Sequence, residues 1–130
     1  MTTKEAYDAL ICKPDLHSIP ELYDNILIWK LYKNAYVQAY CDNGNTCIDI
    51  VGGSMLTGSL MHWHPDETDV IDELYSLGKK GNLLVLKKSL FCTSTFYIGP
   101  SENYPLSDRS RFHFGMKKWD GGRLVYLEQT

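Results

Sequence analysis

The stretch that decides the fold runs from His62 to Leu86 and reads HWHPDETDVIDELYSLGKKGNLLVL. Apolar residues recur at helical spacing in its middle, and this pattern predicts one amphipathic helix over residues 66–77. A strand over residues 56–64 is expected before the helix. After it, residues 83–86 are apolar at every position, which is typical of a strand covered on both faces. We expect the helix to cover one of those faces.

Strand signals continue on both sides of this stretch, because aromatic and β-branched residues are concentrated there. The tetrapeptide Asp42-Asn43-Gly44-Asn45 contains Asn-Gly, which predicts a tight hairpin. In the strand after it, Ile48 and Ile50 share one face, and Cys47, Asp49 and Val51 share the other. The further strands are expected at residues 27–32, 35–41, 46–51, 93–98 and 123–128.

Two pairs of residues near the N-terminus have the spacing of a helix capping box. Thr2 and Glu5 predict a short helix that Pro14 must end, and Ser18 and Glu21 predict one or two helical turns over residues 19–25. Together these elements predict a single α+β domain over residues 1–130. Its antiparallel sheet would have about six or seven strands, with one inserted helix and a short helical N-terminus.

Composition limits the class of protein. The chain has 130 residues, of which 44% are hydrophobic and 22% charged, as in globular domains, and its net charge is −3. An acidic chain argues against nonspecific nucleic-acid binding, although Arg109 to Phe114 interleaves basic and aromatic residues. We find no signal peptide and no apolar run long enough for a membrane span, so we expect a cytoplasmic protein. Its four cysteines are expected to be reduced, with a cross-strand Cys41–Cys47 bridge as the alternative.

The residues His62-Trp63-His64-Pro65-Asp66-Glu67 allow two interpretations. On a strand, His62 and His64 would point to the same face, and with Asp66 or Glu67 they could bind a divalent metal ion. The spacing partly resembles the His-x-His motifs of metallo-β-lactamases and cupins, but the remaining ligands of those motifs are missing. Alternatively, Pro65 marks a strand-to-helix corner, and the acidic residues favour the helix N-terminus. We therefore expect a landmark of the fold, with no metal or other cofactor.

Tyrosine is unusually frequent, with nine residues in the chain. Tyr36 and Tyr40 would lie on one face of a strand, away from Val37 and Ala39. That face is either covered by the helix or free as a binding surface, for which an aromatic strip is typical.

The stretch from Gly58 to Pro100 also resembles small bacterial proteins. The resemblance rests on His-Trp-His-Pro-Asp, on the acidic helix ending in Leu-Gly-Lys-Lys-Gly-Asn, on Leu-Leu-Val-Leu-Lys-Lys-Ser-Leu-Phe and on Tyr-Ile-Gly-Pro. In size, mild acidity and α+β pattern these proteins are similar to immunity proteins encoded beside polymorphic or contact-dependent toxins. The resemblance implies a protein partner, and it carries no functional residues with it.

These observations favour a cytoplasmic bacterial immunity protein, not an enzyme, that neutralises a cognate toxin by masking its active site. The alternative is a small metal-dependent enzyme with His62, His64 and Asp66 as ligands. The expected contacts with the toxin are aromatic and acidic side chains: Tyr36, Tyr40, Asp66, Glu67, Asp69 and Asp72.

Overall fold

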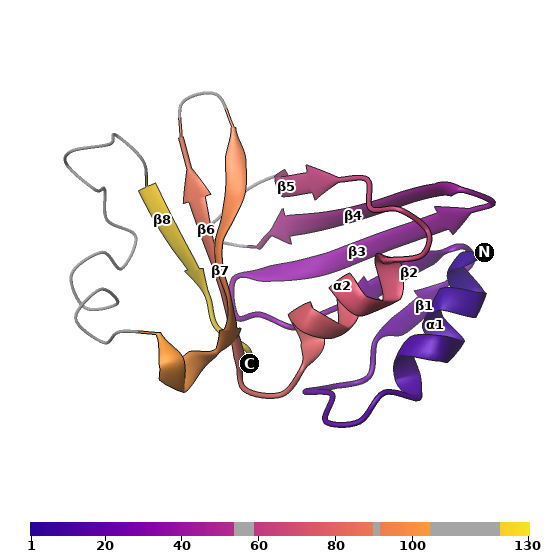
Figure 1. Ribbon diagram of the computed structural model, residues 1–130, viewed down its shortest axis with the longest axis horizontal. Coiled ribbons are helices and arrows are strands. Elements are labelled where there is room, and N and C mark those ends of the chain that lie inside the picture. Colours follow the sequence, from indigo (N-terminus) through magenta and orange to yellow (C-terminus); the bar gives the residue numbers. More distant parts are fainter. Residues whose placement is uncertain (54–58, 90–91, 105–122) are drawn as a thin grey trace.

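The computed structural model describes residues 1–53, 59–89, 92–104 and 123–130, and it has the α+β fold that the sequence predicts (Figure 1). Residues 109–114, with their alternating basic and aromatic side chains, lie outside these ranges. Neither helix in the described ranges is long and apolar enough to cross a membrane. The helices are α1 (Thr3–Ile11) and α2 (Val70–Gly78), and a short 3₁₀ helix, η1 (Ser101–Asn103), follows the seventh strand.

The described strands form two antiparallel sheets where the sequence suggested one. The larger sheet follows the order of the chain, so β1 and β5 are its edge strands. The smaller sheet has the order β7-β6-β8. The strands are β1 (Glu21–Tyr23), β2 (Ile26–Trp29), β3 (Ala35–Asp42), β4 (Asn45–Gly52), β5 (Ser59–Trp63), β6 (Asn82–Lys88), β7 (Thr93–Pro100) and β8 (Arg123–Leu127).

The hairpin between β3 and β4 forms as predicted. Asn43 and Gly44 both have positive φ angles, 44° and 97°, which is the conformation that a two-residue type I′ turn requires. The turn pairs Asp42 with Asn45 and thereby fixes the register of the two longest strands of the sheet. As a result Ile48 and Ile50 are fully buried on one face.

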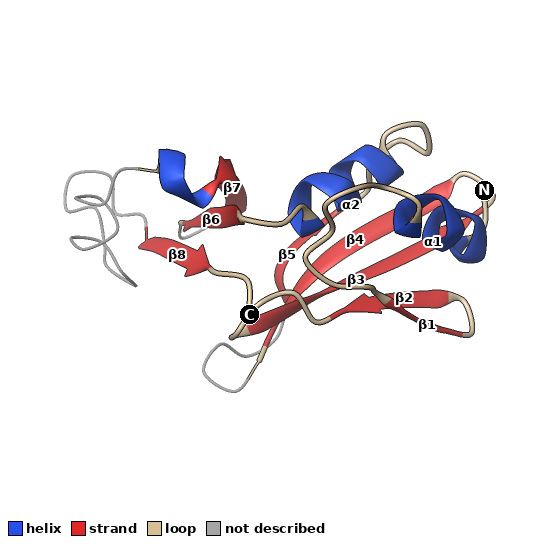
Figure 2. Ribbon diagram, turned by 90° about the horizontal axis from the view of Figure 1, so that it is seen from below, coloured by secondary structure: helices blue, strands red, loops and turns tan. Residues whose placement is uncertain are grey.

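Both helices lie on the same side of the five-stranded sheet (Figure 2). The side chains of Val37, Ile48 and Ile50 point toward the helices. They share one core with Leu10 of α1 and Leu74 of α2, and all five side chains are fully buried. Each such side chain contributes about 1.5–3 kcal/mol by leaving water. The opposite face, which we call the outer face, is not covered by α1 or α2.

Helix α2 packs with its C-terminal backbone directly on Trp29 of β2. The indole is 1% exposed, and its Nε1 donates a hydrogen bond to Ser18 Oγ at 3.0 Å. A Cβ atom on Gly78 would lie 1.8 Å from Trp29 Cη2, so only glycine fits at the end of this helix.

The predicted ends of the helical segments are partly right. The capping box of α1 is confirmed, with Thr2 Oγ1 accepting from the Glu5 backbone N–H at 3.2 Å. Helix α2 begins at Val70 rather than at residue 66, because residues 66–69 form a turn in which the Asp66 carbonyl accepts from the Asp69 N–H. The helix expected over residues 19–25 is wrong, since this segment forms β1 and turns back into β2.

Strand β6 is buried on both faces, as its apolar run predicts. Leu84 and Leu86 belong to the core that includes α2. Leu83 and Val85 point the other way and pack in a second cluster with Tyr104. This double burial makes β6 the element that joins the two cores.

Candidate metal centre

Four side chains capable of binding metal or supporting a metal ligand lie together on the outer face, where β4 pairs with β5. Asp49 pairs with His62 across the two antiparallel strands, and the same register places Cys47 opposite His64, just beyond the end of β5. Since alternate residues of a strand share a face, all four side chains lie on one side. The sequence predicts this shared face for the two histidines.

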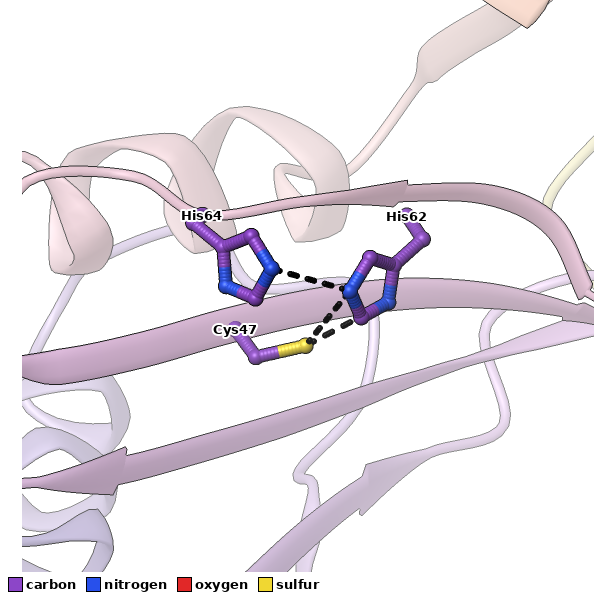
Figure 3. A group of neighbouring side chains, drawn as sticks. All are labelled: Cys47, His62 and His64. Carbon is purple, nitrogen blue, oxygen red and sulfur yellow. Dashed lines mark hydrogen bonds between the residues drawn. The ribbon is translucent and has the colours of Figure 1, made fainter.

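The donor atoms of Cys47, His62 and His64 converge on one point (Figure 3). All three lie within 4.8 Å of one another. The Nε2 atoms of His62 and His64 are 3.1 Å apart, and Cys47 Sγ lies 3.7 Å from His62 Nε2. In a tetrahedral zinc site, bonds of about 2.0 Å to nitrogen and about 2.3 Å to sulfur put two nitrogens about 3.3 Å apart, and nitrogen and sulfur about 3.5 Å apart. The distances from His62 Nε2 to His64 Nε2 and to Cys47 Sγ are close to these two values.

Hydrogen bonds hold both imidazoles in the orientation that a metal ligand needs. His64 Nδ1 donates to the Thr46 carbonyl at 2.9 Å, and His62 Nδ1 donates to Asp49 Oδ1. A carbonyl and a carboxylate can only accept, so each Nδ1 carries a hydrogen, and in the neutral imidazoles each Nε2 then presents its lone pair to the other. Two facing lone pairs at this distance repel unless a proton or a cation lies between them. Carboxylate and carbonyl partners of this kind orient the histidine ligands of metal sites.

The Cys47 thiol lies beside the same carboxylate, with its Sγ 3.6 Å from Asp49 Oδ2. The pKa of this thiol is raised to about 11, mainly by burial. The negative charge of Asp49 and the hydrogen bond to it contribute to this rise in pKa. Because thiolate is the form that binds metal, a metal ion must displace the proton of Cys47.

The ligand set leaves room for a fourth partner of the ion. His62 and His64 are exposed and Cys47 is half-buried, so solvent reaches the point of convergence. Imidazole and thiolate together suit zinc and its neighbours in the first transition row. Three protein ligands with an open fourth position are the arrangement of catalytic zinc sites, whereas structural sites are closed by four protein ligands.

A hollow of about 430 Å³ adjoins two of the three ligands, Cys47 and His64, and Tyr40, Asp66 and Glu67 contribute to its lining. The segment that carries His64 is tied to β4, because Thr46 Oγ1 donates to the Pro65 carbonyl. Glu67 is tied from the other side by the amino group of Met1, whose nitrogen is 2.5 Å from Glu67 Oε1. These two contacts hold residues 65–67, which line the hollow, in place.

The residues predicted for metal binding are brought together only in part. His62 and His64 converge, but Asp66, the expected third ligand, is not among the grouped ligands, and Cys47 is there in its place. The cross-strand Cys41–Cys47 disulfide is not formed. Cys41 is buried toward the helices and pairs with Thr46, while Cys47 lies on the outer face, and all four cysteines are free.

The residues predicted for partner binding lie on two sides of the sheet. Tyr36 and Tyr40 are on the outer face, half-buried and exposed respectively, so the helices do not cover them. Asp66 and Glu67 adjoin Tyr40 at the hollow. Asp69 and Asp72 lie at the start of α2, on the helical side, where Asp72 is 4.0 Å from Lys13 Nζ.

Sequence reasoning missed Cys47 and Asp49 as members of the site. The prediction that these two residues share a strand face was itself right, as was the shared face of His62 and His64. What it lacked was the pairing of β4 with β5. A Cys-x-Asp strand followed by a His-x-His strand, each with its polar residues on one face, is the signal that finds this site.

Function has to be inferred from these side chains and their geometry, because comparison of this chain with protein-family models, with curated proteins and with solved structures finds no match.

Proposed function

We propose that this protein binds a divalent transition-metal ion, most suitably Zn²⁺, through Cys47, His62 and His64. The observation that carries the proposal is the convergence of one sulfur and two nitrogen donors within 4.8 Å of one another. Asp49 orients His62, and the Thr46 carbonyl orients His64. A metal ion at this position supplies a Lewis acid that lowers the pKa of a bound water, so metal-assisted hydrolysis is the class of reaction that the centre supports.

Elemental analysis of protein purified without chelator tests this proposal. We expect about one equivalent of metal in the wild-type protein and almost none in Cys47→Ala, His62→Ala or His64→Ala, because each variant removes one of three ligands. Cys12→Ala and His17→Ala are the matched controls, since neither residue belongs to the ligand group, and both should retain the metal. Substitution by Co²⁺ adds a second readout, a sulfur-to-metal absorption band that requires Cys47.

The proposal fails if the wild-type protein takes up no metal when Zn²⁺ is added in excess. It also fails if the three site variants and the two control variants contain equal amounts of metal. Circular dichroism of each variant shows whether a loss of metal reflects a loss of fold.

As a second candidate function, we propose that the protein is a cytoplasmic immunity protein that masks the active site of a cognate toxin. The supporting observation is the aromatic outer face, on which Tyr23 is 55% and Tyr40 37% exposed. Each hydroxyl donates to a carboxylate on the same strand, Tyr23 to Glu21 and Tyr40 to Asp42. Oriented tyrosines beside carboxylates suit a partner with a basic surface.

Co-expression with the toxin-like gene nearest to this one tests the second candidate. We expect a complex and protection of the cells, both weakened by Tyr40→Ala but not by Ile19→Ala, which removes an exposed side chain outside the strands. This candidate is contradicted if the wild-type protein forms no complex with the toxin and gives the cells no protection.

A further inference from the structure

A second hollow lies on the opposite side of β5, where the two sheets meet. The hollow lies between β5, α2 and the hairpin of β6 and β7, and Figure 1 shows where these elements are. The hollow has a volume of about 380 Å³, and its wall includes Met61 and Trp63 of β5, Leu77 of α2 and Ile98 of β7. Because neighbouring residues of a strand point to opposite faces, Met61 and Trp63 line this hollow while His62 belongs to the metal centre.

The wall of this hollow is mainly apolar. Leu77 and Leu84 are buried at its base, whereas Ile98 at its rim is 38% exposed. Its volume equals that of about a dozen water molecules. Pockets of roughly 300–1,000 Å³ with an apolar wall and a few polar groups are the usual binding sites of small molecules.

One carboxylate gives this pocket its chemical character. Glu73 of α2 is half-buried in the wall, and its Oε2 accepts a hydrogen bond from Trp63 Nε1 at 3.2 Å. Among the described residues, no lysine or arginine forms an ion pair with it. A partly buried carboxylate is costly unless a positive charge or further donors reach it. A ligand would place its positive charge or its hydrogen-bond donors at the second oxygen of Glu73, Oε1.

We propose that this pocket binds a small hydrophobic amine. Its ammonium group would pair with Glu73 and lie near the Trp63 ring, and its aromatic or branched aliphatic body would rest against Met61, Leu77 and Ile98. The carboxylate selects the charge of the ligand, and the size of the hollow limits its body to about one ring with a short side chain. This site is separate from the metal centre and does not depend on it.

Titration with 2-phenylethylamine, followed by two-dimensional NMR of the ¹⁵N-labelled protein, tests the proposal. The indole N–H signal of Trp63, assigned by its absence in Trp63→Phe, should shift in a saturable manner. Two probes with nearly the same body and a different end serve as references. The neutral 2-phenylethanol should bind about tenfold more weakly, and the anionic 3-phenylpropionate should bind more weakly still.

Glu73→Gln is the main variant, because glutamine keeps the shape and still accepts from Trp63 Nε1 while it removes the charge. In this variant the amine should bind about tenfold more weakly, as weakly as the alcohol, whose own affinity should not change. Glu102→Gln, a charge removal outside the pocket, should bind all three probes like the wild type. Ile98→Trp, which fills the open rim, should weaken the binding of amine and alcohol together.

Equal affinities of the wild type for amine and alcohol would overturn the proposal, and so would unchanged amine binding by Glu73→Gln. The proposal is also overturned if no probe shifts the Trp63 signal up to its solubility limit. Titration of His62→Ala in the presence of a chelator separates the two sites. Because the His62→Ala variant holds no metal under these conditions, it should still bind the amine with wild-type affinity, whether the proposal of a metal centre is right or wrong.

Discussion

The affinity of the centre for Zn²⁺ should rise steeply with pH, far beyond the range in which an ordinary cysteine ligand would respond. Burial and Asp49 raise the pKa of the Cys47 thiol to about 11. The free protein therefore carries this proton throughout the range from pH 8 to pH 10, and the complex does not. Since binding releases the proton, a rise in pH favours the complex.

The size of the effect follows from the fraction of thiolate. With a pKa of about 11, that fraction grows about ninetyfold between pH 8 and pH 10, and the apparent affinity grows with it. With an unperturbed pKa of about 8.5 it would grow only about fourfold and level off near pH 9. The two cases differ by more than one order of magnitude, which a binding assay resolves easily.

Competition with a chelator of known pH dependence measures this affinity. Ionisation of a metal-bound water also adds to the pH dependence, so the quantity to compare is the difference between the wild type and Cys47→Ala. Cys12→Ala should behave like the wild type. A plateau near pH 9 in the wild type would refute the argument from burial, and equal slopes in the wild type and Cys47→Ala would refute thiolate ligation.

Three further outcomes are expected. Asp49→Asn should lower the affinity for Zn²⁺ by about 10- to 100-fold, because His62 loses its carboxylate partner, while one equivalent still binds at saturation; an unchanged affinity in a chelator competition would exclude this role. Gly78→Ala should destabilise the protein by about 2–3 kcal/mol or more in urea denaturation, since the new methyl group collides with the Trp29 ring; wild-type stability would show that α2 is not seated on that ring. Thr3→Val should cost about 1–3 kcal/mol in the same assay, because Thr3 Oγ1 is the acceptor for the buried Cys41 N–H at 2.8 Å, and a cost near zero would contradict this.

The sequence predicts the local elements of this fold better than their assembly. The Asn43-Gly44 turn and the alternating burial of β4 follow from rules that act within a few residues, and both are confirmed. The helix over residues 19–25 is wrong because pairing with β2 outweighs a short capping signal. The division into two sheets depends on which strands pair across long connections, and no local pattern specifies that.

The difference between local patterns and long-range strand pairing also explains which site residues the sequence predicts. His62 and His64 are two positions apart on one strand, so strand geometry alone brings them together. Cys47 and Asp49 reach them only through the pairing of β4 with β5. No two-residue turn joins these strands, so the sequence between them does not define their register. The sequence predicts Asp66 as the third ligand because it lies close to the histidines in the chain, but the turn that begins after Pro65 leaves it outside the ligand group.

Strand β5 ends the larger sheet on one side, and this position gives a bound ion a mechanical role in addition to its chemistry. An edge strand offers unpaired backbone groups to solvent and to other chains, and it frays more readily than an interior strand. An ion held between Cys47 of β4 and the histidines at the end of β5 cross-links the edge to the interior of the sheet. Amide hydrogen exchange in β5 should therefore slow when Zn²⁺ is added, while exchange in the hairpin of β3 and β4 changes little. The protein without metal would then be more prone to edge-to-edge association, so its tendency to aggregate would depend on the supply of metal.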